Sequence, residues 1–262
     1  MRSLTKGLDI LFAFTRLHSS LTVKEIAQAV RVTLPTAYRF VKVLSEKGFL
    51  ERDTAGRYRL GLRLLELEGA LHHRMDLETA AKPLVGELAR ISEETVQLTL
   101  LRGDQGICVF VEESPSTLRV APERGRVVPL HAGASVQAML AFLPREEQEN
   151  ILARPLKGFT PDTITDPGKL RRRLQAIRRN GYAVTRGELY PGAVGIAAPV
   201  FDREHRVVAS IAVSGPAQRI GERQKLIAEH TVRVARKISR TLGWHQHGPS
   251  LGRLTVGEEG SG

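Results

Sequence analysis

The sequence predicts an α+β protein in two parts: a small helical module ending in a β-hairpin, then a larger domain around one antiparallel sheet. The first 61 residues show helical spacing of apolar side chains three times, followed by two short alternating stretches. From about residue 95, strand-like stretches recur between helical segments. A length of 262 residues also exceeds that of a typical single domain, which favours two domains.

The net charge of the chain is concentrated near its N-terminus. The whole sequence carries a net charge of +11, with a pI near 10.3. Residues 1–60 contain eleven Lys and Arg against five Asp and Glu, so they supply six of the eleven net positive charges. A basic balance favours a polyanionic partner such as nucleic acid, although ribosomal proteins, membrane-surface proteins and many enzymes share it. The N-terminal segment is the better candidate for that contact.

Cysteine content and hydropathy indicate where the protein resides. The single cysteine, Cys108, excludes an internal disulfide. No apolar run approaches the roughly 18 to 20 residues of a membrane span, and "MRSLTKGLDI" lacks the features of a signal peptide. We therefore expect a cytoplasmic protein with no membrane partner.

Two helices are predicted before residue 31. The first covers "SLTKGLDILFAFTRLHSS", with Ser3 as a possible N-cap and a polar stop at residues 18–20. The second covers "LTVKEIAQAV", where Thr22 and Glu25 have the spacing of a capping box, which satisfies two free amide donors at a helix start.

A third helix is predicted between Thr33, as its cap, and a stop at Gly48. Pro35 fits its first turn, where a missing amide proton is tolerated. The apolar positions that recur at helical intervals, and so should face the core, are Ala37, Phe40, Val41 and Leu44.

The residues left on the outer face of this helix are polar and basic. The second and third predicted helices, joined by a tight connector, have the arrangement of a helix-turn-helix motif. The second helix of such a motif enters the major groove of DNA. The alternative is a three-helix bundle with a solvated basic face. The predicted contacts from the two helices are Thr22, Lys24, Thr33, Thr36, Tyr38, Arg39 and Lys42.

The next segment favours the helix-turn-helix. "GFLERD" and "RYRLG", joined by "TAG", predict a β-hairpin that would form a wing beside the third helix. Its projecting side chains, Arg52, Arg57 and Arg59, would contact the phosphate backbone and supply salt-dependent affinity. The alternative is an ordinary surface hairpin, which would not need to follow directly after a helix of this kind.

The second half predicts a helix leading out of the wing and then an α+β domain. The helical segments are 62–73, 77–94, helices near 135–153 and 168–180, and 221–243. The predicted strands are 95–103, 105–115, 127–130, 182–189, 194–202 and 206–215. Residues 245–262 are rich in Gly and Ser, and we expect a disordered tail there.

No catalytic constellation is present. Cys108 lies in the apolar run "ICVFV", which is typical of a buried structural thiol rather than a nucleophile. A metal site is not indicated by His72-His73 or by His245-Gln246-His247, because neither has carboxylate or cysteine partners at the spacing of metal ligands. No Gly-x-Ser-x-Gly, phosphate loop or His-Glu-x-x-His occurs, so we expect no enzyme, metal or cofactor.

Several motifs together resemble the IclR (isocitrate lyase regulator) family of transcription factors. The N-terminal ones are "SLTKGLDILFAF", "LTVKEIAQAV", "TAYRFVKVLSEKGFLERD" and "GRYRLGLRLLELEG". In the second half, "VVPLHAGASVQAMLAFLP" resembles the family's Pro-Leu-His-Ala signature, and "NGYAVTRGELYPGAVGIAAPVFDREHRVVASIAVSGP" resembles its C-terminal stretch. The resemblance covers about residues 3–243.

The resemblance implies four regions. These are a winged helix-turn-helix domain at 1–61, a linker and dimerisation helix at 62–75, a GAF-like effector-binding domain at 76–244, and the tail. It also implies a transcriptional regulator that binds double-stranded DNA at a palindromic operator as a dimer or tetramer. A small effector, expected to be an organic or aromatic acid, would modulate that binding from the C-terminal domain.

The effector pocket is placed by the same resemblance. The residues that it implies are Ala134, Ser135, Thr185, Gly195, Ala212 and Ser214. Independently of the resemblance, the small-residue runs "HAGAS" and "PGAVGIAAP" would leave space for a ligand, although tight packing explains any single glycine equally well. Arg119, Arg124 or Arg126 could pair with a carboxylate. The sequence departs from the family pattern at Val136-Gln137, usually Gly-Lys, at Thr185 and Gly195, and at Pro35, which lies about two places late. These departures leave the ligand open.

Two alternatives remain on the sequence alone. The chain could be an enzyme or metal-binding domain carrying a basic winged-helix attachment module, which predicts turnover or bound metal and equal affinity for unrelated duplexes. It could also be a winged-helix regulator of another family, which would share the DNA function but not the pocket.

Overall fold

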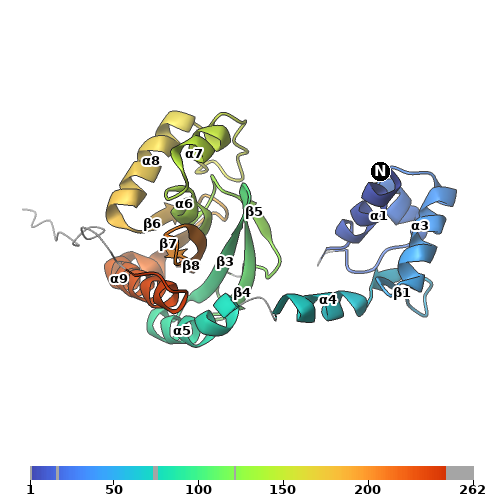
Figure 1. Ribbon diagram of the computed structural model, residues 1–262, viewed down its shortest axis with the longest axis horizontal. Coiled ribbons are helices and arrows are strands. Elements are labelled where there is room, and N and C mark those ends of the chain that lie inside the picture. The colour runs from blue at the N-terminus through green and yellow to red at the C-terminus, as the bar shows by residue number, and fades with distance from the viewer. Residues whose placement is uncertain (1, 16–17, 73–75, 121, 246–262) are drawn as a thin grey trace, which may run out of the picture. The chain divides into compact units, whose positions relative to one another are not determined.

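The computed structural model describes residues 2–15, 18–72, 76–120 and 122–245. The chain divides into two compact units, Met1–Met75 and Asp76–Gly262 (Figure 1). The predicted tail beyond residue 245, and with it His247, lies outside the described residues, as does His73.

The first unit has three helices, a two-stranded antiparallel hairpin and a further helix. They are α1 (Arg2–Phe12), α2 (Val23–Ala29), α3 (Leu34–Glu46), β1 (Leu50–Arg52), β2 (Tyr58–Leu60) and α4 (Arg63–His72). Ile10, Ile26, Ala37 and Val41 are almost fully buried and form the centre of its core. The predicted helix-helix-helix-hairpin order is confirmed.

Local signals set the ends of α2 and α3. The Thr22 amide donates to Glu25 Oε2 at 2.6 Å, and the Glu25 amide donates to Thr22 Oγ1 at 3.3 Å, which is the predicted capping box. Thr33 is the N-cap residue of α3, but its side chain makes no capping hydrogen bond. Gly48, with φ of +75°, follows the end of α3 as predicted.

The first helix differs from the prediction. It begins at Arg2, so Ser3 lies inside it and is not its N-cap, and it ends at Phe12 rather than near residue 18. After the helix, Thr15 and His18 form reciprocal backbone hydrogen bonds of 3.0 and 3.2 Å. Helical spacing of apolar residues continues beyond the helix, because Phe14 still packs into the core from the segment that follows it.

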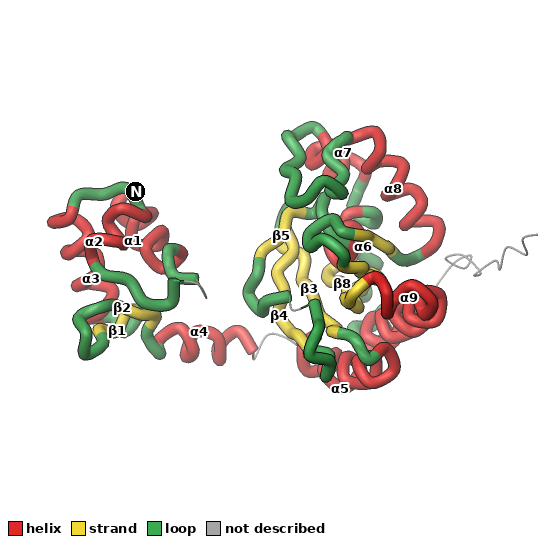
Figure 2. The backbone as a smooth tube through the Cα atoms, turned by 180° about the vertical axis from the view of Figure 1, so that it is seen from behind, coloured by secondary structure: helices red, strands yellow, loops and turns green. Residues whose placement is uncertain are grey.

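The second unit is built on a six-stranded antiparallel sheet of order β5-β4-β3-β8-β7-β6. Figure 2 shows its strands in yellow among the red helices of this unit. Its strands are β3 (Thr95–Arg102), β4 (Gln105–Glu112), β5 (Val127–Pro129), β6 (Ala183–Arg186), β7 (Ala193–Phe201) and β8 (Val207–Pro216). Its helices are α5 (Asp76–Ser92), α6 (Ala134–Leu140), α7 (Arg145–Leu152), α8 (Pro167–Asn180) and α9 (Ala217–Thr241). The predicted antiparallel α+β domain is confirmed.

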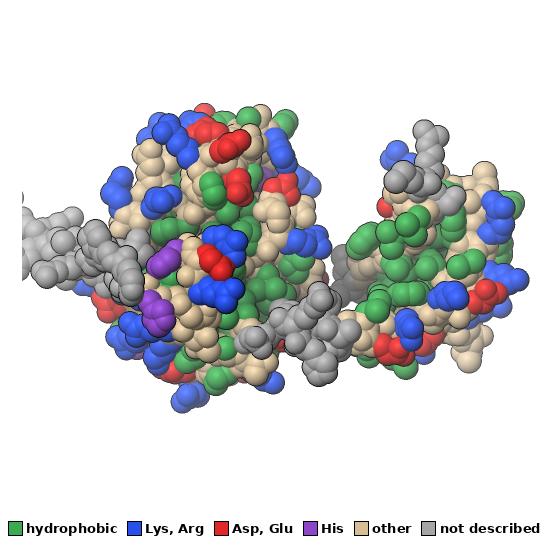
Figure 3. All heavy atoms as spheres, in the orientation of Figure 1, with side chains coloured by type: hydrophobic (Ala, Val, Ile, Leu, Met, Phe, Trp, Pro, Cys, Tyr) green, Lys and Arg blue, Asp and Glu red, His purple; other side chains and the backbone are tan. Residues whose placement is uncertain are grey.

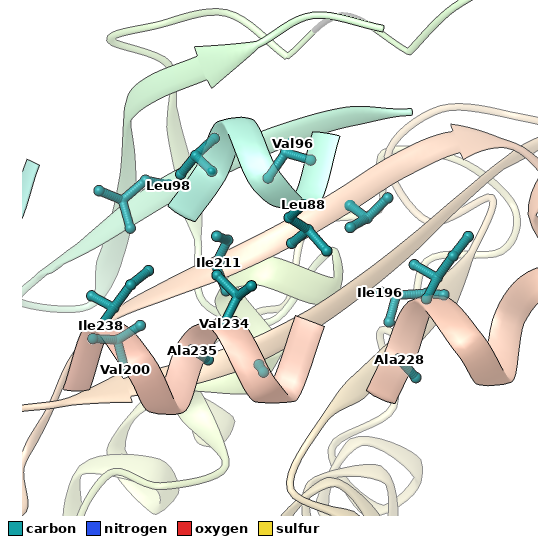
Figure 4. Packing of buried hydrophobic residues seen from close by; sticks show 14 of the residues in the cluster. Leu88, Val96, Leu98, Ile196, Val200, Ile211, Ala228, Val234, Ala235 and Ile238 are labelled. Carbon is teal, nitrogen blue, oxygen red and sulfur yellow. The ribbon is translucent and has the colours of Figure 1, made fainter. Parts of the chain in front are cut away.

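Helices cover both faces of this sheet. α5 and α9 pack on one face, and Figure 4 shows Val96, Leu98, Ile196 and Ile211 meeting them in a continuous core. α6 packs on the other face, with α8 beside it. Because side chains alternate along a strand, the even-numbered residues of β3 face α5 and α9 and its odd-numbered residues face α6. Within the described ranges, no helix is long and apolar enough to cross a membrane.

Candidate nucleic-acid interface and ligand cavity

The outer face of α3 is exposed and carries positive charge. Ala37 and Val41 point into the core, which turns Tyr38, Arg39 and Lys42 outward. Tyr38 is 55% exposed, and no carboxylate lies within 4.0 Å of Arg39 among the described residues. Lys42 makes only a long, exposed ion pair with Glu46, at 3.9 Å. This face is therefore available to an anionic partner.

The start of α3 adds hydroxyl groups to the same face. The hydroxyls of Thr33 and Thr36 lie 2.9 Å apart, which explains why Thr33 does not cap the helix with its side chain. On α2, Lys24 is exposed, while the Thr22 side chain is engaged in its capping box. The seven predicted helix residues thus lie at the start of α2 and along α3.

The three wing arginines have different environments. Arg52 is exposed, with its guanidinium 6.0 Å from the centre of the Tyr58 ring. Arg59 is exposed and pairs with Glu51 at 3.2 Å. Both side chains are exposed, although the strand register places them on opposite faces of the hairpin, with Arg52 across from Tyr58 and Arg59 across from Glu51.

Arg57 instead ties the hairpin to the first turn of α2. Its Nη2 donates to the Ser20 carbonyl at 2.7 Å and to Glu25 Oε2 at 3.0 Å, and its Nε donates to Ser20 Oγ at 3.1 Å. The hydrogen bonds from Thr22, with the charge of Arg57, lower the pKa of Glu25. Arg57 therefore positions the wing, a role that its spacing in the sequence did not reveal.

A cavity that is partly open to solvent lies on the α6 side of the sheet in the second unit. Its base is formed by β3 and β4, through Gln97, Thr99 and Cys108. The start of α6 and strands β6, β7 and β8 form its walls, and the segments around Arg126 and Tyr190 complete the lining.

Five of the six predicted pocket residues line this cavity: Ala134, Ser135, Thr185, Gly195 and Ser214. The sixth, Ala212, is not among the lining residues. It lies opposite Gln97 on β3 and Ala197 on β7, is 1% exposed, and packs in the core beneath α6.

Small residues keep the cavity open. A Cβ atom on Gly195 would lie 3.1 Å from Ala134 Cβ, tighter than ordinary van der Waals contact. Gly133 has φ of +96°, and a Cβ atom there would lie 2.6 Å from Leu189 Cδ1. The left-handed backbone therefore favours glycine at residue 133, and any larger residue would also displace the Leu189 side chain.

Of the three arginines considered as carboxylate partners, only Arg126 lines the cavity. Arg119 pairs with Glu113 at 2.8 Å, and Arg124 pairs with Glu78 at 3.7 Å. The Arg126 guanidinium lies 4.9 Å from the centre of the Tyr190 ring, and no ion pair involves it among the described residues. It is a half-buried cation whose charge faces a cavity.

Glu188 and Cys108 also line the cavity, and both are ionisable. Glu188 is 4% exposed, and its Oε2 accepts hydrogen bonds from the Gly133 amide at 3.0 Å and from Gln137 Nε2 at 2.6 Å; burial raises its pKa. Cys108 is 4% exposed, and burial raises the pKa of its thiol to about 11. That thiol is neutral at physiological pH, which does not suit a nucleophile.

Sequence reasoning missed Gln97, Thr99, Glu188 and Tyr190 as lining residues. The alternation of β3 offered one signal, because it places Gln97 and Thr99 on the same face of the strand. Nothing in the spacing predicted which face lies against the cavity. For metal binding, the part of the chain that the structure describes contains no cluster of three or more His, Cys, Asp or Glu side chains.

Comparisons with known proteins match both units. A family model for the helix-turn-helix domain of IclR matches residues 3–54, and one for the C-terminal domain of the bacterial transcriptional regulator IclR matches residues 69–240. The HTH-type transcriptional regulator KipR of Bacillus subtilis is 37% identical over 93% of this chain and 98% of its own length. The HTH-type transcriptional repressor AllR of Escherichia coli is 31% identical over 94% of this chain and 92% of its own.

Solved structures of IclR proteins are also similar to this chain. The Thermotoga maritima IclR has a TM-score of 0.76 at 32% identity, over 93% of this chain and all of its own. An IclR homologue from Microbacterium hydrocarbonoxydans, solved in complex with 4-hydroxybenzoate, has a TM-score of 0.82 at 28% identity, over 92% of this chain and 98% of its own.

Proposed function

The chain belongs to the IclR family of bacterial transcriptional regulators, and we propose from that premise that a small acid, bound in the cavity of the second unit, adjusts its affinity for a palindromic operator. The observation that supports an acid as the ligand is Arg126, a half-buried cation that lines the cavity. A carboxylate beside it would gain a charge-assisted hydrogen bond in a partly desolvated setting. A carboxylate ligand is therefore the class that the cavity favours.

We propose that α3 lies in the major groove with Tyr38, Arg39 and Lys42 toward the bases and phosphates. The exposure of these side chains and the absence of acidic residues between them support the assignment. Arg52 and Arg59 would contact the phosphate backbone from the wing, giving affinity without sequence information. Thr33 and Thr36 would approach the backbone at the start of the helix.

A dimer would supply the second half-site contact. Helix α1 and the start of α4 expose an unusual set of large apolar side chains, and Figure 3 shows hydrophobic side chains gathered on the first unit. They are Leu4, Leu8, Phe12, Leu62, Leu65 and Leu67, each 47% exposed or more. A patch of this kind on a soluble unit marks an interaction surface. We propose that it pairs with the same surface of a second copy, as a palindrome requires.

The ligand would act through the difference in its affinity for two arrangements of the dimer, since a ligand can shift an equilibrium only by that difference. The relatives are named as regulators, and the neutral thiol of Cys108 offers no nucleophile. We accordingly assign no catalytic role, and place the protein in the cytoplasm with its DNA.

The test is binding to the intergenic DNA beside the protein's own gene, at fixed salt and with unrelated duplex as competitor. Binding should survive competitor and shift when one acid of a panel of organic and aromatic acids is added. Arg39→Ala should weaken specific binding at least tenfold, as expected for loss of a base or phosphate contact. Lys47→Ala, an exposed cation past the end of α3, is the matched control. Equal affinity for operator and unrelated duplex would contradict the proposal.

A further inference from the structure

Unpartnered polar atoms are concentrated on the face of the sheet that bears the cavity. Five buried side-chain oxygens or nitrogens in the described residues have no hydrogen-bond partner, and three of them lie on β3 and β8. They are Gln97 Oε1, Thr99 Oγ1 and Ser210 Oγ, and Thr99 and Ser210 are directly opposite in the strand register. Opposite residues of paired strands share a face.

Gln97 and Thr99 line the cavity itself. They are separated by one residue on β3, so their side chains leave the strand about 7 Å apart on one face. Thr99 is only 2% exposed. Buried polar atoms are normally paired, because leaving them unpaired costs free energy. A polar pair without partners at the base of a ligand cavity is therefore suited to hydrogen-bond with the ligand.

The chemistry of the two side chains limits what they can accept. Gln97 Oε1 can only accept a hydrogen bond, whereas the Thr99 hydroxyl can donate one. A carboxylate has no proton to give to Gln97, and a hydrocarbon end would leave both atoms unpaired. A hydroxyl group donates to one and accepts from the other.

We propose that the effector is a hydroxy acid, whose carboxylate pairs with Arg126 and whose hydroxyl is recognised by Gln97 and Thr99. This inference rests on the proposed acid effector and adds its second functional group. It makes Gln97 and Thr99 the residues that distinguish a hydroxy acid from the same acid without its hydroxyl. A site built to bond a hydroxyl rejects the analogue lacking it, because its own polar atoms are then left unpaired.

The experiment measures dissociation constants by calorimetry for two matched pairs: benzoate with 4-hydroxybenzoate, and butanoate with 4-hydroxybutanoate. The full-length protein should prefer the hydroxylated member of at least one pair by about tenfold or more. Thr99→Val keeps the shape of the side chain and Gln97→Met keeps its length, and each should reduce that preference to about twofold or less. Arg126→Gln should weaken both members of the pair equally.

Thr231→Val is the matched control, since Thr231 is fully buried on α9, where its hydroxyl donates to the Ile227 carbonyl. It should leave the preference unchanged. Acids that bind without discrimination, or a preference that persists in Thr99→Val and Gln97→Met, would overturn the inference while leaving the acid effector in place. If none of the four acids binds, the proposed acid effector fails and this inference fails with it.

Discussion

Glu188 is a buried carboxyl group whose two hydrogen-bond donors, the Gly133 amide and Gln137 Nε2, are both neutral. Burial therefore dominates and raises its pKa, although Arg173 opposes this from a greater distance and Asp162 adds to it. The folded protein consequently holds a proton on Glu188 at pH values where the unfolded chain has released it.

The raised pKa of Glu188 determines whether the free energy of unfolding rises or falls with pH. Because the folded state binds this proton more tightly, Glu188 lowers the free energy of unfolding as pH rises from about 4.5 through its raised pKa. Glu188→Gln removes that contribution, so the variant should gain stability relative to the wild type over this range. Denaturant unfolding at several pH values, followed by fluorescence of Trp244, the single tryptophan, measures it in the second unit.

Glu149 provides a control of opposite sign. Its hydrogen bond with Arg171 lowers its pKa, so its contribution is present above 4.5 and disappears on acidification. Glu149→Gln should therefore be less stable than the wild type at pH values above about 4.5, and this difference should disappear as pH falls through the lowered pKa of Glu149. Parallel pH profiles for the wild type and Glu188→Gln would refute the role of Glu188.

At the scale of elements, three similar arginines on one hairpin have different environments. Arg57 holds the hairpin against the first turn of α2 through Ser20 and Glu25. Arg52 and Arg59 are exposed. Sequence reasoning grouped all three as phosphate contacts, because an alternating pattern gives the face of a strand but not the side chains that reach it from elsewhere.

The two kinds of arginine should respond differently to substitution. Arg52→Ala should reduce the slope of log affinity against log salt concentration by about 1, as expected for one lost phosphate contact, with unchanged unfolding of the first unit. Arg57→Ala should lower the unfolding midpoint of the first unit, because it removes three hydrogen bonds. DNA binding across a salt series and thermal unfolding monitored by circular dichroism distinguish them. A lower midpoint in Arg52→Ala and none in Arg57→Ala would reverse this assignment.

At the scale of the whole molecule, the exposed apolar side chains of α1 and α4 predict self-association. Leu8→Glu places a charge within that surface and should shift the protein toward monomer in sedimentation velocity, with weaker binding to a two-half-site operator. Leu226→Glu is the control, since Leu226 is 46% exposed on α9, against 48% for Leu8. An unchanged sedimentation profile for Leu8→Glu would show that this surface is not the contact between copies.

The sequence by itself determined the features that depend on neighbouring residues. Thr22 and Glu25 specified the start of α2, Gly48 the end of α3, and alternation the strands of both units. These succeed because capping, left-handed turns and strand faces are set within a few residues. The end of α1 was missed, since Phe14 keeps a helical spacing while it packs into the core from beyond the helix.

Only the tertiary structure decided which distant residues share a site. It brought Arg126 to the ring of Tyr190 and put Ala212 into the core instead of the cavity wall. It also paired Arg119 with Glu113 and Arg124 with Glu78. It also left Gln97 and Thr99 without partners at the base of the cavity. The physical reason is that strand order, register and helix packing determine these meetings, and none of them is encoded in local spacing.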